Sequence, residues 1–268
     1  MSDILAEIVA HKKIEVAARK QQRSAAELEQ APAFKRTPLS LRRFLQDPAK
    51  TGIIAEFKRR SPSKGLINGN VTVQDITTAY TRYGASGLSV LTDEKFFGGT
   101  ADDLQQARAA NNIPILRKDF MIDEYQIIEA KAIGADVILL IAECLTAAEV
   151  AQLATFANNL GLEVLLEVHS ELQLEKVSEH VHLVGVNNRD LTTFKVDFNR
   201  SCELAPKIPA GKLKVAESGI NDPAAIITLK QAGFEGFLIG EHFMRQEDPA
   251  RAFEQFAAAI KSGENVKQ

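Results

Sequence analysis

Short apolar runs alternate with stretches of helical spacing from residue 52 onward, and this alternation restricts the possible folds more than any other feature of the chain. Eight such runs can be counted: GIIAEF, GLSVLT, IPILRK, ADVILLIA, LEVLLEV, HLVGVNN, KVAES and GFLIG. Four of the helical stretches close on a glycine just before the next run, at Gly84, Gly134, Gly161 and Gly233. Glycine often supplies the left-handed residue that ends a helix. Strands that follow helices at short spacing favour right-handed βαβ units and a parallel sheet.

Eight strand–helix repeats within ~200 residues are typical of a (β/α)8 barrel, an α/β fold also called a TIM barrel. The alternative is a doubly wound open sheet, which would carry a G-x-G-x-x-G turn after an early strand. The chain contains neither this turn nor a G-x-x-x-x-G-K-[ST] loop. We therefore predict a single domain over residues 1–268, with the barrel at 51–262.

Residues 1–50 precede the repeat and are predicted to form a helical extension. Apolar residues between Ile4 and Val9 recur at helical spacing, but Lys12 and Arg19 interrupt the stripe further along. The segment LSLRRFLQ (39–46) is a candidate second helix. We expect the extension to pack on the barrel with its charges in solvent. The alternative is that its basic residues help to cover the mouth of the active site.

Charge and composition exclude several classes of protein. With 32 Lys and Arg against 35 Asp and Glu, the net charge of −3 gives no general attraction to nucleic acid or anionic membranes. The start of the chain has charges throughout and no signal-peptide core. The longest strongly apolar run, VILLIA (137–142), is too short to span a bilayer. We predict a cytoplasmic protein, most simply a monomer, without nucleic-acid or membrane partners.

Polar residues end several of the apolar strands, where barrel enzymes carry their chemistry. Because side chains alternate along a strand, Glu56 and Lys58 share a face with Ile54 and would point into the barrel. The third strand ends in Lys118 and the fifth in Glu167. The ends of the sixth and seventh strands read Asn187-Asn188-Arg189-Asp190 and Glu217-Ser218-Gly219.

Convergence of these charges indicates a site, because buried charges are costly unless they are paired. Taken singly, each signal has a structural interpretation. Glu56 and Lys58 could satisfy one another, and Arg117 could pair with Asp119 for structural reasons.

The last two loops predict a phosphate site. SGINDPAAII follows the seventh strand and IGEHFM follows the eighth, and barrels commonly bind phosphate with backbone N–H groups at these positions. Gly219 and Gly240 would let the backbone approach the ligand, and Ser61 in the first loop could add a hydroxyl donor. The alternative is that the two glycines only make tight turns.

Metal chemistry is not predicted. Cys144 and Cys202 lack metal-ligand spacing, and Cys144 ends an apolar run as a small buried side chain would. His169 and His242 belong to no set of ligands at metal-binding spacing, and H-E-x-x-H is absent. We interpret both histidines as structural or peripheral.

Six motifs, in this order, together resemble the indole-3-glycerol-phosphate synthase family: IIAEFKRRSPSKG (53–65), LRKDF (116–120), LLEVH (165–169), GVNNRDL (185–191), VAESGI (215–220) and FLIGEHFM (237–244). The resemblance covers essentially the whole chain, including the helical extension. It implies a cofactor-independent carboxy-lyase of tryptophan biosynthesis that acts on a small phosphorylated substrate.

The resemblance also implies residue roles. Lys118 would be the general acid of ring closure. Glu167 and Lys58 would carry the later acid–base steps, while Glu56 and Asn187 orient them and the substrate. Asn188, the second Asn of the motif, receives no role because it varies in the family.

Substrate contacts are expected from Ser218, Glu217 and Arg189, although Arg189 could instead pair with Glu217. The phosphate would be bound by Ser61, Gly219, Gly240 and Glu241. Some family members have serine at position 241, so only the backbone N–H of Glu241 is assigned this role, with its carboxylate turned away.

The loop that carries Ser61 is expected to act as a mobile lid. Its cations Arg59, Arg60 and Lys64 are interpreted as a solvated surface that attracts an anionic substrate.

Two other functions are alternatives for a barrel of this kind. Phosphoribosylanthranilate isomerase also needs a general acid and base, but it has no carboxylate-releasing step, and the four charges Glu56, Lys58, Lys118 and Glu167 argue against it. A catalytically silent barrel that binds a phosphorylated metabolite would have lost some charged strand ends, and here all are present.

Overall fold

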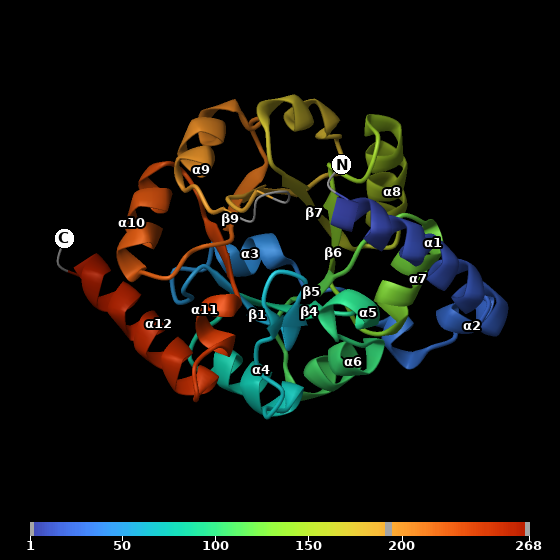
Figure 1. Cartoon of the computed structure of the whole chain (residues 1–268), viewed down its shortest axis with the longest axis horizontal. Coiled ribbons are helices and arrows are strands. Elements are labelled where there is room, and N and C mark those ends of the chain that lie inside the picture. Colours follow the sequence, from blue (N-terminus) through green and yellow to red (C-terminus); the bar gives the residue numbers. More distant parts are fainter. Residues whose placement is uncertain (1–2, 191–194, 266–268) are drawn as a thin grey trace.

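Eight parallel strands close into a barrel within the residues that the computed structural model describes, 3–190 and 195–265. Leu191, the last residue of the GVNNRDL motif, lies outside these ranges. Around the barrel the strand order is β1-β10-β9-β8-β7-β6-β5-β4, and helices surround it (Figure 1). The strands are β1 (Ile53–Phe57), β4 (Gly87–Leu91), β5 (Ile115–Lys118), β6 (Val137–Ile141), β7 (Glu163–Val168), β8 (Leu183–Asn187), β9 (Leu213–Glu217) and β10 (Gly236–Ile239). All eight predicted runs form these strands, so the (β/α)8 prediction is confirmed.

Helices follow the strands as the periodicity predicts. Those outside the barrel are α4 (Val73–Arg82), α6 (Ala101–Ala110), α7 (Glu124–Ala132), α8 (Ala147–Asn159), α9 (Asn199–Leu204), α10 (Pro223–Gln231) and α12 (Pro249–Asn265). Shorter pieces are α5 (Glu94–Phe97), α11 (Glu241–Met244) and the 3-10 turns η1 (Pro32–Lys35), η2 (Glu171–Lys176) and η3 (Ala205–Lys207). None of the helices in the described ranges combines the length and the apolar character that a membrane crossing requires.

The four helix-closing glycines adopt the left-handed conformation. Their φ angles are 97° at Gly84, 97° at Gly134, 79° at Gly161 and 89° at Gly233. Each lies between a helix and the next barrel strand, so the chain reverses there without the steric penalty that a Cβ atom would bring.

Two apolar layers result from the alternation of side chains along the strands. Ile53 and Phe57 of β1 pack outward against the helices, while Ile54 packs inside the barrel with Leu116 and Leu165. The interior is therefore a packed core, and the polar residues proposed for the site lie at the carboxyl ends of the strands.

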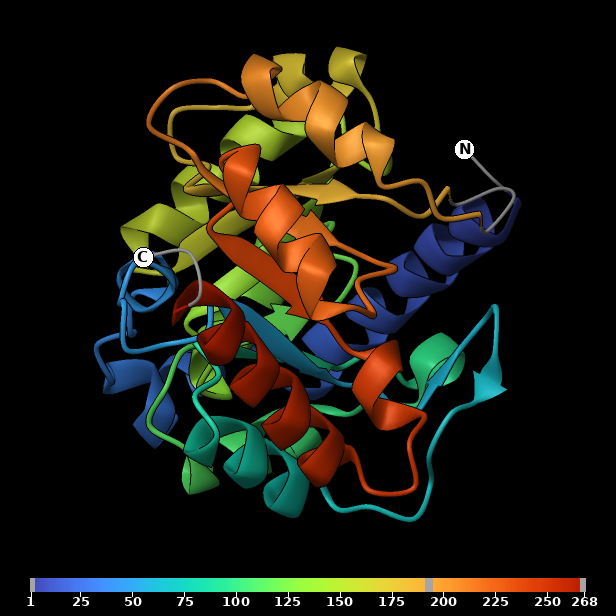
Figure 2. The same ribbon diagram turned by 90° about the vertical axis from the view of Figure 1, so that its left-hand side faces the viewer.

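The N-terminal extension touches both ends of the barrel. Its helices are α1 (Asp3–Gln22), α2 (Ala25–Glu29) and α3 (Leu41–Leu45). Helix α3, which was predicted within LSLRRFLQ, buries Leu41 and Leu45 against the barrel interior. Helix α1 lies toward the same end of the barrel as the hairpin of β2 (Arg60–Ser61) and β3 (Gly65–Leu66) (Figure 2).

The expectation that the charges of the extension lie in solvent is wrong for Lys12. Leu5, Ile8, Lys12 and Val16 form one buried stripe along α1, and the side chain of Lys12 is 0% exposed. The lysine therefore continues the stripe instead of interrupting it, because carboxylates on neighbouring loops pair with its ammonium group.

Candidate active site

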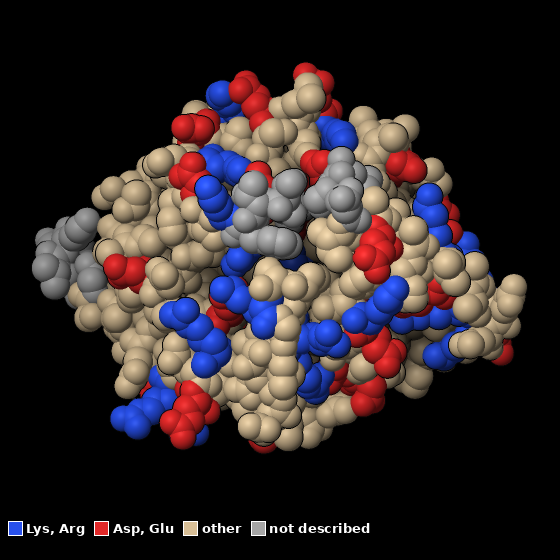
Figure 3. All heavy atoms as spheres, viewed as in Figure 1, with Lys and Arg blue, Asp and Glu red and all other residues tan. Residues whose placement is uncertain are grey.

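A cavity of about 260 Å³ opens at the carboxyl ends of the strands. Every site residue proposed from the sequence lines it: Glu56, Lys58, Ser61, Lys118, Glu167, Asn187, Arg189, Glu217, Ser218, Gly219, Gly240 and Glu241. Lys and Arg side chains gather around the middle of the face shown in Figure 3, which is the face of α5 and α11 in Figure 1. The residues are thus brought together as expected, while their individual roles stay predictions.

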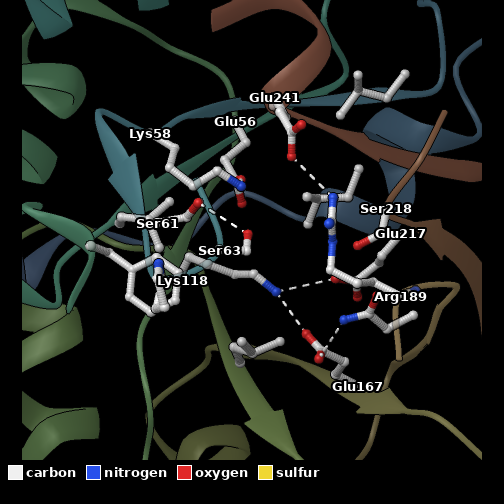
Figure 4. A pocket seen from close by; sticks show the side chains of 18 of the residues that line it. Glu56, Lys58, Ser61, Ser63, Lys118, Glu167, Arg189, Glu217, Ser218 and Glu241 are labelled. Carbon is white, nitrogen blue, oxygen red and sulfur yellow. Dashed lines mark hydrogen bonds and ion pairs between the residues drawn. The ribbon is translucent and has the colours of Figure 1, made fainter. Parts of the chain in front are cut away.

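Lys118 lies at the centre of the charged cluster. Its Nζ is 2.8 Å from Oε2 of Glu167 and 3.1 Å from Oε2 of Glu217, two residues that come from β7 and β9 (Figure 4). The other oxygen of Glu167, Oε1, accepts a hydrogen bond of 2.9 Å from Nδ2 of Asn187. Strand ends that are far apart in the sequence therefore meet through this one ammonium group.

Burial and the charges of the neighbouring groups shift the pKa values of Lys118, Glu167 and Glu217 in different directions. Burial alone would lower the pKa of Lys118, but the carboxylates of Glu167 and Glu217 raise it above its ordinary value. Burial would raise the pKa of Glu167, yet the charge of Lys118 lowers it to about 2. For Glu217 burial prevails, and with the nearby charge of Glu167 it raises the pKa to about 7. At neutral pH Glu167 is therefore ionised, while Glu217 can hold a proton.

Glu56 and Lys58 form a second pair on the same rim. Nζ of Lys58 is 2.7 Å from Oε1 of Glu56, and Oγ of Ser89 donates to Oε2 of Glu56 at 3.3 Å. The side chain of Glu56 occupies the space next to Gly240, where a Cβ atom would lie 2.7 Å from Oε1. Gly240 has φ of −130°, which is not in the left-handed region. Glycine is therefore needed here to leave space for the Glu56 side chain, and not to allow a positive φ.

The structure does not show the pairing of Arg189 with Glu217 that the sequence analysis left open as an alternative to a substrate contact. Nη2 of Arg189 is 3.0 Å from Oε2 of Glu241, whereas Glu217 is paired with Lys118. The carboxylate of Glu241 is therefore not turned away from the pocket, because it extends along the rim to the guanidinium group (Figure 4). Nζ of Lys64 lies 4.0 Å from the other oxygen of Glu241.

The predicted phosphate residues all line the cavity. Oγ of Ser61 in the hairpin is 3.4 Å from Oγ of Ser63, and Gly219 follows β9 with φ of 77°. Ser218 has φ of 69°, the only positive φ of a non-glycine residue among those described. A strained residue directly after Glu217 is the kind of backbone that functional sites retain.

The structure also shows the surroundings of four other residues that the sequence analysis named. Arg117 and Asp119 are a buried structural pair, with Nη2 and Oδ2 3.0 Å apart. His169 is less peripheral than expected, because its Nε2 lies 3.5 Å from Oε1 of Glu167. Cys144 is only half-buried, and burial raises the pKa of its thiol to about 12.

Metal ligation finds no support within the described ranges, where no group of three His, Cys, Asp or Glu residues could hold a metal ion. Independence of cofactors stays a prediction.

Sequence reasoning missed the apolar wall of the pocket. Ile4, Leu5 and Ile8 of α1 line the cavity, and Phe97 and Phe120 from the loops after β4 and β5 line it as well. The extension therefore covers the mouth with apolar side chains and not with the basic residues considered from the sequence. The helical stripe was visible, but nothing local in the sequence indicates what a stripe will pack against.

The raised pKa of Glu217 leads to a prediction about stability. Between about pH 4.5 and pH 7 the folded chain holds a proton on Glu217 that the unfolded chain releases, so stability falls as pH rises through this window. Glutamine cannot titrate, so Glu217→Gln should lose less unfolding free energy than the wild-type protein between pH 5 and pH 7.5. We expect the difference between the two losses to be on the order of 1–3 kcal/mol.

Urea unfolding of both proteins at the two pH values measures this difference. Glu254→Gln, a change at an exposed glutamate on α12, is the control and should keep the wild-type pH dependence. Equal pH dependence in wild type and Glu217→Gln would show that Glu217 titrates normally.

A closed parallel barrel with acid and base side chains at its strand ends defines the chain as a (β/α)8-barrel enzyme. The comparisons with known proteins narrow this class. The chain belongs to the indole-3-glycerol phosphate synthase family, whose sequence model matches residues 5–256.

Several curated relatives bear the name indole-3-glycerol phosphate synthase. The protein from Bacteroides thetaiotaomicron is 46% identical over 261 residues, which cover 97% of this chain and 100% of the relative. The protein from Bordetella pertussis is 44% identical over 253 residues, covering 93% and 97%. A solved structure titled "Native KDPGal structure" shares the fold, with a TM-score of 0.58 and 14% identity over 83% of this chain and 98% of that one.

Proposed function

We propose that the cavity converts 1-(2-carboxyphenylamino)-1-deoxyribulose 5-phosphate into indole-3-glycerol phosphate, carbon dioxide and water, without a cofactor. By its family the chain is a carboxy-lyase of tryptophan biosynthesis. The observation that carries the proposal is the Lys118 ammonium, held at 2.8 Å and 3.1 Å between two buried carboxylates beside the cavity.

Ring closure needs an activated carbonyl. The ring carbon that bears the carboxylate attacks the C2 carbonyl, whose oxygen becomes an alkoxide and takes a proton. We assign this proton to Lys118, because its ammonium group stays protonated at neutral pH and the alkoxide that forms is a strong base. Glu217 can then return a proton to Lys118 over the 3.1 Å contact, since its pKa of about 7 lets it hold one at neutral pH.

Loss of carbon dioxide restores aromaticity to the ring, so this step has its own driving force. A hydroxyl group must then leave with a proton, and a second proton must come off to complete the indole. Glu167 is ionised and can accept a proton, while Lys58 can donate one to the leaving hydroxyl. Asn187 and Glu56 orient these two groups through their contacts of 2.9 Å and 2.7 Å.

The charges around the cavity match an anionic substrate. The substrate carries a carboxylate and a phosphate, and Lys58, Lys118 and Arg189 line the cavity. We assign the phosphate to Ser61, to the backbone at Gly219 and Gly240, and to the backbone N–H of Glu241 at the start of α11. Oε1 of Glu217 is buried and has no hydrogen-bond partner among the described residues, so we assign it to a substrate hydroxyl together with Ser218.

Mixing the purified, metal-free protein with this substrate tests the proposal. The chain contains no tryptophan, so indole fluorescence would come from the product alone. We expect emission to grow without any added cofactor, at a rate proportional to the protein concentration. The same assay at several protein concentrations, combined with sedimentation, tests whether the monomer predicted from the sequence is the active form.

Failure to form product would overturn the proposed reaction. Titration of the product would then separate the remaining functions, because tight binding without turnover indicates a silent binding barrel. Absence of both turnover and binding would contradict the assignment of the cavity itself.

A further inference from the structure

The buried Lys12 is the starting point of a further inference. Its Nζ lies 2.8 Å from Oδ2 of Asp93, 2.9 Å from Oδ1 of Asp119 and 3.0 Å from Oε2 of Glu15. Asp93 and Asp119 have fully buried side chains and belong to the loops after β4 and β5. One side chain of the N-terminal helix is thus tied to two loops at the mouth of the cavity.

These contacts belong to a closed ring of alternating charges. The ring, called the charge ring below, runs Lys12–Asp119–Arg117–Glu129–Arg19–Glu15 and returns to Lys12. Beyond the contacts of Lys12, Arg117 is 3.0 Å from Asp119 and 2.6 Å from Glu129, and Arg19 is 3.0 Å from Glu129 and 2.5 Å from Glu15. Each charge is flanked by two of opposite sign, so the ring joins α1 to β5 and α7.

The charge ring reaches the residue next to the proposed general acid. Asp119 follows Lys118 directly, and its Oδ1 also accepts a hydrogen bond of 2.8 Å from the backbone N–H of Phe120. Burial would raise the pKa of Asp119, but Arg117 and Lys12 hold it well below the ordinary value. Asp119 and Phe120 line the cavity, so the ring fixes backbone that carries Lys118 and part of the pocket wall.

Lys12 also separates two parts of α1 that are held in different ways. The later part is anchored by Val16, which packs with Tyr125 and Leu28. The earlier part carries Leu5 and Ile8, which line the cavity. Lys12 therefore lies between the anchored part of the helix, which also carries Glu15 and Arg19 of the charge ring, and the part that covers the pocket.

Stability alone does not account for this arrangement. Replacement of a buried ion cluster by well-packed apolar residues is often neutral or stabilising, because desolvation offsets much of the attraction between the charges. Ion pairs with hydrogen bonds fix the direction and register of the elements that they join, and apolar contacts do not.

We propose that Lys12 is a positioning residue of the reaction. Through the charge ring it holds the first turns of α1 over the cavity and fixes the backbone at Asp119, so that Lys118 faces Glu167 in a pocket closed to water on that side. Exclusion of water strengthens the effect of Lys118 on the developing alkoxide, since electrostatic interactions grow as the effective dielectric constant falls. The inference rests on the proposed function, because the reaction that Lys12 would assist is the proposed one.

Lys12→Met tests the inference, with Lys13→Met as the matched control on the exposed side of the same helix. We expect Lys12→Met to lower kcat/KM by ~10–10²-fold, because small displacements of reacting groups are costly. We also expect faster amide hydrogen exchange in residues 3–11. Lys13→Met should stay within about twofold of wild type in kcat/KM.

A second variant separates positioning from folding. Loss of Lys12 leaves Asp93 and Asp119 as buried carboxylates with one cation fewer, and this can destabilise the chain by itself. Lys12→Met/Asp93→Asn removes one of these charges while the asparagine can still cap α5, so we expect stability to recover and kcat/KM to stay low. Lys12→Arg keeps the cation and should restore part of the activity.

Three outcomes would overturn the inference. These are wild-type kcat, KM and pH profile in Lys12→Met, full activity in the stable double variant, or unchanged hydrogen exchange in residues 3–11. If the wild-type protein itself makes no product, the proposed function fails. The exchange measurement then still tests whether Lys12 holds the helix over the cavity.

Discussion

Lys118→Met is expected to lower kcat by ~10²-fold or more while the affinity for the product falls much less. Methionine keeps an unbranched side chain, but it can neither donate a proton nor balance Glu167 and Glu217, which lie 2.8 Å and 3.1 Å from the ammonium. The product lacks the carboxylate that the substrate carries, so loss of a cation should raise KM more than the dissociation constant of the product.

Steady-state indole fluorescence gives kcat and KM, and titration of the product gives its affinity. Lys95→Met is the control, because Lys95 is an exposed lysine of α5, near the same face of the barrel. Near-normal turnover in Lys118→Met would remove Lys118 from the role of general acid and leave Lys58 as the candidate.

The same variant should change how stability depends on pH. The charge of Lys118 is the main reason that Glu167 stays ionised despite burial, so without it the pKa of Glu167 rises from about 2. A carboxyl group whose folded pKa lies above its unfolded value favours the folded chain less as pH rises. Lys118→Met should therefore lose more stability between pH 5 and pH 8 than the wild-type protein.

The fold could be predicted because its determinants are local. Each barrel strand is a short apolar run, and glycines such as Gly84 mark the helix ends that precede the next strands. The face shared by Glu56 and Lys58 followed from the alternation of side chains, and their 2.7 Å contact agrees with it. Convergence of Lys118 and Glu167 followed from the rule that parallel strands end on one face.

What could not be predicted depends on pairing across the chain. Arg189 pairs with Glu241 and Glu217 pairs with Lys118, and these partners come from strand ends and loops that meet only in the closed barrel. From the sequence, Lys12 interrupts an apolar stripe, because its two fully buried partners, Asp93 and Asp119, lie about 80 and 107 positions away. These partners belong to loops whose arrangement only the closed barrel fixes. Local patterns define elements, whereas the pairing of buried charges depends on the assembled fold.

Asp136→Ala is expected to cost about 3–5 kcal/mol of unfolding free energy while leaving the chemistry intact. Asp136 is fully buried just before β6, at the end of the barrel opposite the cavity. Its Oδ1 accepts from Arg36 at 2.6 Å and from the N–H of Leu39 at 2.7 Å. Its Oδ2 accepts from Arg108 at 2.9 Å and from the N–H of Ile115 at 2.8 Å.

Removal of this carboxylate takes the ion-pair partner from Arg36 and Arg108 and the acceptor from the N–H groups of Leu39 and Ile115. It also breaks the contact that holds Leu39, just before α3, to the barrel. Urea unfolding measures the loss, and Asp102→Ala on the exposed side of α6 is the control, expected to change stability by less than about 1 kcal/mol. The folded fraction of Asp136→Ala should keep wild-type kcat, because the amino ends of the strands support the barrel while the carboxyl ends carry the reaction. A loss of kcat in protein that is demonstrably folded would mean that the two ends of the barrel are coupled, and the separation argued from this fold would not hold.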